Sequence, residues 1–516
     1  MRSLKLICSI AMVLTAAASG LAQARPDAVP GELLVKFSGR TDGSKAKAAN
    51  RAVGAEPAED LGDLGWQRVK LPDGLSADKA ADRYRQMDGV ESVQPNYIYH
   101  LLATPNDPLF TDPGMYGLGK ISAPAAWDLT TGSSSVVVAD IDTGMLYTHQ
   151  DLQANAWVNT GEIPNNGVDD DGNGKIDDVY GWDFFYDDPN PIDDAVGHGT
   201  HTAGTIGAVG NNALGVVGVN WNVKIMAIKI YSPNGGDSTS AMLVKAYAYI
   251  RMMKLRGVNI RVTNNSYGGC GEACGYDQAT KDGIDAMGDA GIVNVFAAGN
   301  SNTNNDTTPS YPVSYTSPSI IGVAASTSTD AKAGFSSYGI NTVDLAAPGS
   351  NVLSTYNTTG TATATLSGTS MATPHVTGAV ALLSAYAPAL SAASLKATIL
   401  NNVDVIPAWA TLVKTGGRLN VDRALRNITV CSFTPASPSV TVPTKGGLFT
   451  VSVTTGTNCD YMVKSTAKWV KILSSDTMSG NGTITFRVTP NPTITRSAVI
   501  SVGGQSYSVR QSRDGS

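Results

Sequence analysis

Ser370 stands where the polar, glycine-rich start of GTSMATPHVTGAVALL (residues 368–383) gives way to small apolar residues. The pattern predicts a buried helix with this serine in its first turn. Serine often caps a helix there, because its oxygen accepts a hydrogen bond from a free backbone N–H. The position would also suit a nucleophile, if the chain supplies a base, an acid that orients the base and donors for a developing oxyanion.

Asp142 and His198 are the candidates for the orienting acid and the base. Asp142 ends the apolar run VVVADI before a glycine, and His198 follows a glycine in GHGTHTAG. Near neutral pH a histidine is the simplest general base. His198 is the best placed of the five histidines, because the preceding turn exposes it at the start of a helix. His201 and His375 are expected to pack inward.

Asn300 is the candidate oxyanion donor. It ends the run IVNVFAAGN, so its amide would stand at a strand end, and the backbone N–H of Ser370 at a helix start would be a second donor. Each of these residues alone is more often a cap or a turn residue. Together, in the chain order Asp, His, Ser, they predict nucleophilic acyl transfer.

The surrounding region must position these residues. From about residue 104, apolar runs such as SSVVVADI, VKIMAIKIY and SIIGVAA alternate with helical stretches until about residue 425. Near-continuous apolar strands are typical of a parallel sheet buried on both faces. We therefore predict an α/β domain whose site lies beyond the carboxyl ends of its strands.

The chain of 516 residues has a net charge of −6 and no basic tract, which argues against a nucleic-acid partner. Residues 1–24 have Arg2 and Lys5 before a short apolar run and end in Ala-Gln-Ala, as a secretory signal peptide does. No later apolar run has the length of a membrane span. We expect a secreted protein that does not span a membrane.

The cysteines agree with export. After Cys8 is removed with the signal peptide, Cys270, Cys274, Cys431 and Cys459 remain, an even number that suits an oxidising compartment. Four cysteines allow three pairings. We favour Cys270–Cys274 and Cys431–Cys459, because these pairs lie in separate regions, and four free thiols is the alternative.

Two flanking regions differ from the middle region in amino-acid composition and in hydrophobic pattern. Residues 25–103 are rich in charge and show strands and helices of a small α+β unit, including GELLVKF and SADKAADRYRQM. From Cys431 to residue 516, short alternating runs such as LFTVSVTT are separated by Gly, Asn and Pro turns. This spacing predicts an antiparallel β-sandwich of immunoglobulin-like size.

An acidic stretch, NNGVDDDGNGKIDDVYG (165–181), is similar to a calcium loop. Alternating oxygen-bearing residues and a sharp glycine turn deliver the ligands that Ca²⁺ prefers. The EF-hand glutamate is missing, so Asp177 or Asp178 would have to close the site. A solvated acidic turn is the alternative. The predicted ligands are Asp169, Asp171, Asn173 and Asp178.

The middle region resembles the subtilisin-like serine proteases, the subtilase family. The resemblance rests on DIDTGMLYTHQDL, GHGTHTAGTIG, NNSYGG, VFAAGN and GTSMATPHVTG, in that order, and covers roughly residues 104–425. It implies a catalytic domain at 104–427 in which Asp142 orients His198 and His198 deprotonates Ser370. Asn300 and the Ser370 N–H would form the oxyanion hole, and peptides would be hydrolysed through an acyl-enzyme.

The resemblance also implies a cleft that binds the substrate as an extended strand between two edges. Small walls suggest a roomy pocket, with broad preference for apolar or aromatic residues before the cut. The loop between Cys270 and Cys274 could stiffen the pocket rim. The implied edges are Ser266, Tyr267 and Gly268 on one side and Gly235 and Gly236 on the other; the pocket would be lined by Ala297, Ala298 and Gly299.

A second, structural calcium site is implied by the family. It would join the THQDL stretch, the loop inside the histidine-bearing helix and the mature N-terminus. Such an ion would stabilise the fold by binding only the native state. The implied ligands are Asp107, Asp151 and Asn212, with carbonyl groups of Val209, Leu214 and Val216.

The flanking regions resemble known companions of this family. Residues 25–103 are similar to an inhibitor-type propeptide, which implies a zymogen cut by its own active site near residues 100–105. Residues 431–516 are similar, more weakly, to a BACON-type β-domain, whose ligand, a glycan or a surface, stays open. The chain would act on polypeptides, bind its own propeptide, work as a monomer and be extracellular, with cell-surface association open.

Three functions are therefore compared. A broad secreted endopeptidase explains the whole set of motifs. A calcium-bound adhesive protein would not need Asp142, His198, Ser370 and Asn300 together. A narrow-specificity processing protease would be favoured by a strongly acidic cleft, but Asp237 is the only acid near the Gly235 edge.

Overall fold

The computed structural model describes residues 28–97 and 104–512, except residues 195, 237, 269–274 and 492–493. The chain forms one compact unit that ends at Leu101 and a second that begins at Leu102. Residues 1–24, the Cys270–Cys274 pair and most of the expected cleavage region lie outside the described residues. No helix of the described residues is long and apolar enough to cross a membrane.

The first unit is a small α+β fold, as predicted. Its antiparallel sheet has the order β2-β3-β1-β4, and alternating β1 residues such as Leu33 and Val35 pack on both helices. β2 was not predicted, because all five of its residues are exposed and show no apolar alternation. The elements are β1 (Ala28–Phe37), α1 (Ser44–Val53), β2 (Glu56–Asp60), β3 (Trp66–Lys70), α2 (Ala77–Arg85) and β4 (Val90–Tyr97).

The second unit begins with the predicted α/β domain. Its nine-stranded sheet has the order β14-β15-β11-β10-β9-β8-β5-β7-β6, and every pair except β14–β15 is parallel. The strands are β5 (Gly132–Asp142), β6 (Gly181–Asp183), β7 (Asn222–Lys229), β8 (Ile260–Asn265), β9 (Val293–Ala297), β10 (Ile320–Ser326), β11 (Leu345–Pro348), β14 (Asp404–Val405) and β15 (Gly417–Arg418).

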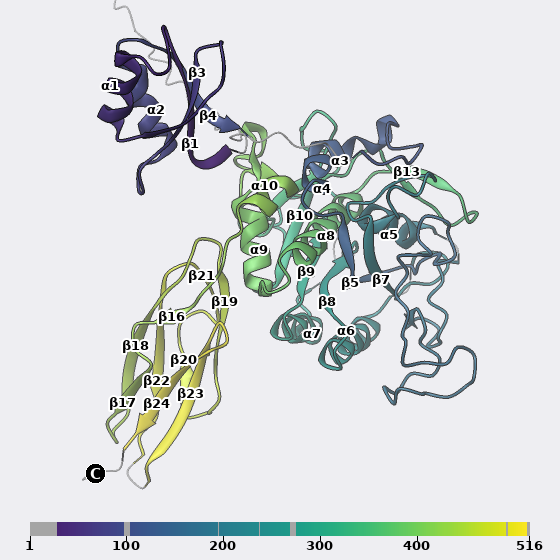
Figure 1. Ribbon diagram of the computed structural model, residues 1–516. Helices are drawn as coiled ribbons and strands as arrows, with labels where there is room; N and C mark the ends of the chain where they lie inside the picture. Colours follow the sequence, from purple (N-terminus) through teal and green to yellow (C-terminus); the bar gives the residue numbers. More distant parts are fainter. Residues whose placement is uncertain are drawn as a thin grey trace, which may run out of the picture. The chain divides into compact units, whose positions relative to one another are not determined.

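Helices cover both faces of this sheet (Figure 1). α5 and α8 pack on one face, and α6 and α7 pack on the other. The apolar runs form strands buried on both faces because each face meets helices. The bounds are α5 (His198–Gly207), α6 (Ser240–Leu255), α7 (Gln278–Asp289), α8 (Thr369–Tyr386), α9 (Ala392–Asn401) and α10 (Val421–Arg426), with η1 (Pro113–Met115), α3 (Tyr116–Lys120), α4 (Ala123–Trp127), η2 (Pro407–Trp409) and a hairpin of β12 (Val352–Thr355) and β13 (Thr363–Leu366).

The strand order explains where a site can form. β5 lies between β7 and β8, and the chain continues from β5 toward β7 and β6 but later returns to β8 on the other side. The connections that leave β5 and β8 therefore diverge, which opens a crevice at the carboxyl ends of these strands. Asp142 ends β5, and Ser266 follows β8.

The C-terminal part is the predicted β-sandwich. Its sheets have the orders β16-β18-β22-β20 and β17-β24-β23-β19-β21 around a shared apolar core. One pair differs from the antiparallel prediction, since β17 runs parallel to β24. The strands are β16 (Thr434–Pro435), β17 (Ser439–Val442), β18 (Gly447–Thr454), β19 (Asp460–Ser465), β20 (Val470–Ile472), β21 (Thr477–Ser479), β22 (Gly482–Val488), β23 (Arg496–Val502) and β24 (Gln505–Gln511).

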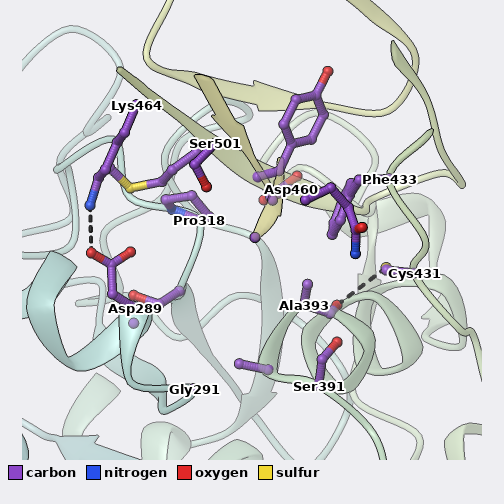
Figure 2. A pocket seen from close by; sticks show the side chains of 18 of the residues that line it. Asp289, Gly291, Pro318, Ser391, Ala393, Cys431, Phe433, Asp460, Lys464 and Ser501 are labelled. Atoms are coloured by element: carbon purple, nitrogen blue, oxygen red, sulfur yellow. Dashed lines mark hydrogen bonds and ion pairs between the residues drawn. The ribbon is translucent and has the colours of Figure 1, made fainter. Parts of the chain in front are cut away.

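The Cys431–Cys459 disulfide is present and joins the segment before β16 to the start of β19. Lys464 forms an ion pair with Asp289, and Cys431 Sγ lies 3.5 Å from the Ala393 carbonyl oxygen (Figure 2). A buried ion pair of 2.7 Å joins Lys396 to Asp460. These contacts border a cavity of about 830 Å³ at the amino ends of β9 and β10, on the far edge of the sheet from Asp142.

Candidate active site

Asp142 and His198 meet at the carboxyl end of β5. His198 is the first residue of α5, and Gly197 before it takes the left-handed conformation, with φ of 69°, which glycine adopts without strain. His198 Nδ1 lies 2.7 Å from Asp142 Oδ1, and that oxygen also accepts from the Thr143 N–H at 2.7 Å. The carboxylate is almost fully buried, whereas the imidazole keeps 27% of its side-chain surface exposed. The imidazole therefore keeps an accessible face while the carboxylate stays shielded from solvent.

Asp193 fixes the start of α5. Its carboxylate accepts from the Gly197 N–H at 3.1 Å and from the N–H and hydroxyl of Thr200 at 3.0 and 2.8 Å. Burial raises the pKa of Asp193 against these hydrogen bonds. The sequence did not single out this residue, because it lies five residues before the start of α5, outside the N-cap position where a capping side chain is expected.

Electrostatics favour a charged imidazole at His198. Burial is the largest influence and lowers the pKa of His198, but the charge and the hydrogen bond of Asp142 outweigh it, so the pKa is raised above 6.5. A base that is stabilised when protonated suits proton transfer from a hydroxyl.

The other histidines of the α/β domain are buried, as predicted for two of them. His201 Nε2 lies 3.0 Å from the Val352 carbonyl oxygen, and His375 Nδ1 lies 2.9 Å from that of Met371. Burial lowers the pKa of each to about 4. They stay neutral near pH 7 and serve packing.

Ser370 is the second residue of α8 and does not cap it. The N-cap position is Gly368, and no side chain makes a capping bond there. The Ser370 hydroxyl donates to the Ser266 carbonyl oxygen at 3.0 Å, and the Ser266 hydroxyl donates to the Ser370 carbonyl oxygen at 2.9 Å. Among the contacts of the described residues, none joins Ser370 to His198. The hydroxyl must rotate away from Ser266 before His198 can accept its proton.

Asn300 is held with a defined orientation. Its Oδ1 accepts from the backbone N–H of Thr369 at 2.8 Å and from the Thr369 hydroxyl at 2.9 Å. The Nδ2 group is therefore the free end, and it lies toward Gly368 at the start of α8. Asn300 and Ser370 line the same cavity of about 250 Å³. Two donors can thus be directed at one point in this cavity.

The predicted pocket residues mostly line this cavity. Ser266, Tyr267, Gly268, Ala297 and Gly299 do so. Ala298 does not: it is fully buried and packs in a small core on the far side, because adjacent residues of an extended segment point to opposite sides. The sequence did not indicate the rest of the wall, which carries the hydroxyl groups of Ser301, Thr303, Thr308, Ser310 and Ser337 and the ring of Pro309.

The Gly235–Gly236 turn lies beside the histidine loop. Ser232 closes it, donating from its N–H and hydroxyl to the Gly236 carbonyl oxygen at 3.1 and 3.0 Å. Gly235 approaches the side chain of Val196, two residues before His198. The turn is therefore near the site, as an edge of a substrate cleft would be.

The residues of the family-implied calcium site lie together. Asp151 Oδ1 and Oδ2 accept from Asn212 Nδ2 at 3.1 Å and from the Val216 N–H at 2.9 Å. The Val209 N–H donates to the Asp151 carbonyl oxygen at 2.7 Å. Asp107 Oδ2 accepts a hydrogen bond from the N–H of Asn211 in the same loop. Leu214 also belongs to this loop.

This loop fits a divalent cation. Both aspartates are buried, and Asp107 Oδ1 has no hydrogen-bond partner. Burial, then the nearby charge of Asp151, raise the pKa of Asp107 against backbone hydrogen bonds. A cation would neutralise the pair and occupy the free oxygen.

The acidic loop brings together a different set from the one predicted. One carboxylate oxygen each of Glu162, Asp171 and Asp178 lies within 4.8 Å of the others. Asp169 lies outside this group, because its carboxylate accepts from the N–H groups of Asn173 and Gly174 at 3.0 and 2.8 Å. Glu162 precedes the motif by several residues and was missed for that reason.

Asn173 contacts two members of the group, with Nδ2 3.1 Å from Asp171 Oδ2 and 2.9 Å from Asp178 Oδ2. Asp177, the alternative for closing the site, instead accepts from the N–H groups of Asn166 and Gly167. These contacts therefore favour Asp178 over Asp177 as the residue that would close the metal site.

The fold and the site define the class. A parallel α/β sheet carries an acid, a histidine, a serine and an oriented amide at the carboxyl ends of its strands. These are the kinds of residue that form the active site of a serine hydrolase. Residues 133–427 match the model of the subtilase family, and residues 16–96 match that of the fervidolysin N-terminal prodomain. The chain belongs to the subtilase family and is a subtilisin-like serine endopeptidase with an N-terminal prodomain.

Individual proteins that are similar to this chain are proteases as well. An extracellular protease of Xanthomonas campestris pv. campestris is 33% identical over 73% of this chain and 68% of its own. Thermitase of Thermoactinomyces vulgaris is 36% identical over 63% of this chain and 99% of its own. A solved protease from Pseudoalteromonas arctica aligns with a TM-score of 0.50 and 28% identity over 63% of this chain and 99% of its own.

Proposed function

We propose that the protein is a secreted endopeptidase that cleaves polypeptides through an acyl-enzyme on Ser370, with His198 as general base and Asp142 as its orienting acid. The observation that carries this is the 2.7 Å contact of His198 with buried Asp142 at the edge of the crevice where Ser370 lies. The pairing holds the imidazole in the tautomer whose Nε2 can accept a proton.

Substrate binding would start the reaction. The Ser266 carbonyl oxygen, which accepts from Ser370 in the free enzyme, is a main-chain acceptor at the edge of the cleft. An extended substrate offers N–H groups to such an edge. When a substrate N–H takes this acceptor, the Ser370 hydroxyl is released and can turn toward His198.

The chemistry then follows in two steps. Ser370 Oγ attacks the peptide carbonyl carbon while its proton passes to His198, and Asp142 stabilises the imidazolium. His198 gives the proton to the leaving amine as the C–N bond breaks, which leaves an ester on Ser370. Water repeats the sequence on the ester and regenerates the hydroxyl. Asn300 Nδ2 and the Ser370 N–H would bind the oxyanion in both steps.

The cavity would bind the residue before the cut. No charged side chain is among the described residues that line it. An apolar or aromatic side chain suits its small walls at Ala297 and Gly299, and the hydroxyl groups near its rim would tolerate a polar tip. We therefore propose uncharged side chains at this position, apolar and aromatic ones above all.

Structural calcium is general in this family, and two places suit it. The Asp107–Asp151 loop would hold one ion with Asn212 and the carbonyl groups of Val209, Leu214 and Val216. The group of Glu162, Asp171 and Asp178 would hold a second. Calcium would neutralise clustered carboxylates and so stabilise the fold without taking part in bond cleavage.

The flanking regions would control where and when the enzyme acts. The prodomain match supports a zymogen in which residues 25–103 inhibit the enzyme until they are cut. The signal-like residues 1–24 and the similarity to extracellular proteases support secretion. The β-sandwich of residues 431–516 is proposed as an accessory module, with its ligand open.

The test compares the wild-type chain with Ser370→Ala. The wild type should lose the segment before about residue 104, seen by mass spectrometry, and should digest casein. The variant should stay full-length and inert while folding normally. Equal behaviour of the two proteins would overturn the proposal, because Ser370 would then have no chemical role.

A further inference from the structure

A second buried carboxyl group lies beside Asp142. Asp140 is two residues earlier on β5, so both side chains face the α5 and α8 side of the sheet. Each residue is 2% exposed. The proposed mechanism does not use Asp140, because the contact to His198 is made by Asp142. An ionised carboxylate in such a place costs several kcal/mol without a compensating partner, so this acid needs an explanation.

Asp140 contacts two buried polar groups on different elements. Its Oδ1 accepts from Asn264 Nδ2 at 2.8 Å, and its Oδ2 lies 3.0 Å from the hydroxyl of Thr202. Asn264 belongs to β8, and Thr202 belongs to α5, the helix that His198 begins. Asp140 thus joins the strand that leads to Ser266 to the helix that carries the base.

The contacts continue to the nucleophile. Asn264 Nδ2 also donates to the Ser266 hydroxyl at 3.0 Å, and that hydroxyl donates to the Ser370 carbonyl oxygen at 2.9 Å. Asn264 Oδ1 accepts from Thr377 of α8 at 3.1 Å. The amide of Asn264 is therefore fully used, and Asp140 is the acceptor that fixes which way it points.

The geometry favours a protonated Asp140. Thr202 Oγ1 lies 3.0 Å from both Asp140 Oδ2 and the Gly199 carbonyl oxygen. A hydroxyl has a single proton, and a carbonyl has none to give. Each contact has a proton of its own only if Thr202 donates to Gly199 and Asp140 donates to Thr202; with Asp140 ionised, the two oxygens would have to share the single Thr202 proton.

The charged and titratable neighbours agree. Asp142 lies along the same strand, and His198 faces Asp140 from α5, while Asn264 of β8 and Thr377 of α8 bring neutral groups. Burial, then the charge of Asp142, raise the pKa of Asp140 well above its ordinary value against the hydrogen bonds and His198. Thr202 and Asn264 are themselves fully buried, so no water need share these bonds.

We propose that Asp140 is a positioning residue that stays protonated and locks Asn264, and through it the Ser266–Ser370 contact, in the geometry the nucleophile needs. Its neutrality also leaves Asp142 as the one charged partner of His198 on β5. This role rests on the proposed function of Ser370 and His198.

The test compares Asp140→Asn with Asp140→Val in the mature enzyme. Asparagine keeps one acceptor for Asn264 and one donor for Thr202, so kcat and the acid limb of the pH profile should stay close to wild type. Valine removes both contacts, so kcat should fall between about 10- and 100-fold with KM little changed. Active-site titration counts the folded molecules, and thermal unfolding in the Ser370→Ala background checks each fold.

Two outcomes would overturn the proposal. One is an acid limb displaced to lower pH in Asp140→Asn, since that requires a negative charge on Asp140 in the wild type. The other is full kcat in Asp140→Val. An infrared band of a protonated carboxylic acid at pH 8, absent from Asp140→Asn, should accompany the expected result. Wild-type protein that neither cleaves peptides nor reacts at Ser370 would instead contradict the proposed function.

Discussion

Thr369 holds Asn300 by two hydrogen bonds to a single oxygen, from its backbone N–H at 2.8 Å and from its hydroxyl at 2.9 Å. The residue next to the proposed nucleophile, Ser370, thereby decides which end of the Asn300 amide faces the cavity. A flipped amide would turn its oxygen, an acceptor, toward the cavity and would lose both hydrogen bonds from Thr369. The arrangement leaves the Nδ2 group of Asn300 free to donate, as the proposed oxyanion hole requires.

Asn300→Asp tests this donor with an isosteric side chain. The carboxylate keeps an acceptor for Thr369 but has no N–H for the oxyanion, so kcat should fall by about 10²- to 10³-fold with KM nearly unchanged. Steady-state kinetics on a chromogenic peptide checks it, and Thr303→Val, a change in the same cavity wall, is the matched control. Unaltered kcat in Asn300→Asp would remove Asn300 from the mechanism.

The pH dependence of activity should report His198. The protonated imidazole cannot accept the Ser370 proton, so activity rises as the pH rises through the pKa of His198. Because Asp142 raises that pKa above 6.5, the midpoint of the acid limb of kcat/KM should lie above pH 6.5. Replacing Asp142 by Asn should lower kcat by about 10⁴-fold, because the imidazole is no longer held in the tautomer that leaves Nε2 free to accept a proton. A midpoint below 6.5 would show that burial outweighs Asp142.

Stability should depend on pH through other histidines. The pKa values of His201 and His375 are about 4 in the folded protein and 6.5 in the unfolded chain. The unfolded chain therefore binds more protons between these values, and stability falls as the pH drops from about 6.5 to about 4. Urea unfolding of Ser370→Ala, which cannot digest itself, measures this.

A matched variant identifies the groups responsible. His375→Asn removes one titrating site, so the free energy of unfolding should fall less steeply over the same range. Equal slopes in the two proteins would assign the acid sensitivity to other groups.

The sequence predicted residues that lie in local patterns and missed residues that are brought together from distant parts of the chain. Asp142, His198, Asn300 and Ser370 each lie within a local pattern, where an apolar strand or helix meets a glycine, and such patterns are visible along the chain. The fold class followed from the same runs, because strands buried on both faces are continuously apolar. Ala298 was misplaced because it was assigned to the cavity wall together with both of its neighbours, although adjacent residues of an extended segment point to opposite sides.

Residues joined across the fold could not be inferred. Glu162 meets Asp171 and Asp178 only after the acidic loop has folded back, and Asp140 meets Thr202 and Asn264 only in the assembled sheet. β2 escaped prediction because none of its side chains is buried. These are tertiary contacts, and no periodicity along the chain encodes them.

Calcium removal should destabilise the enzyme. A site filled at about a thousand times its Kd contributes about 4 kcal/mol, so a chelator should lower the melting temperature of Ser370→Ala. Asp151→Asn should start lower and respond less to the chelator, whereas Asp282→Asn, an exposed acid on α7, should behave like the parent. Calorimetry with and without Ca²⁺ decides it. A melting temperature indifferent to chelation in the parent would argue against structural calcium.

The Cys431–Cys459 disulfide should stabilise the β-sandwich. It closes a loop with a sequence separation of 28 residues, for which chain entropy gives about 3 to 4 kcal/mol. The double variant Cys431→Ser/Cys459→Ser should unfold its β-sandwich at lower denaturant, while Ser432→Ala, an exposed neighbour, should not. Limited proteolysis of the Ser370→Ala background locates the loss. Cleavage first inside the α/β domain would contradict the assignment.

The central claim is that Ser370 is a nucleophile activated by His198. A fluorophosphonate reacts covalently only with such an activated serine, so the mature enzyme should be labelled once per chain, and peptide mass mapping should place the label on Ser370. His198→Ala should abolish labelling while leaving the fold intact. A label on a different serine, or an unlabelled enzyme that still digests casein, would contradict the account.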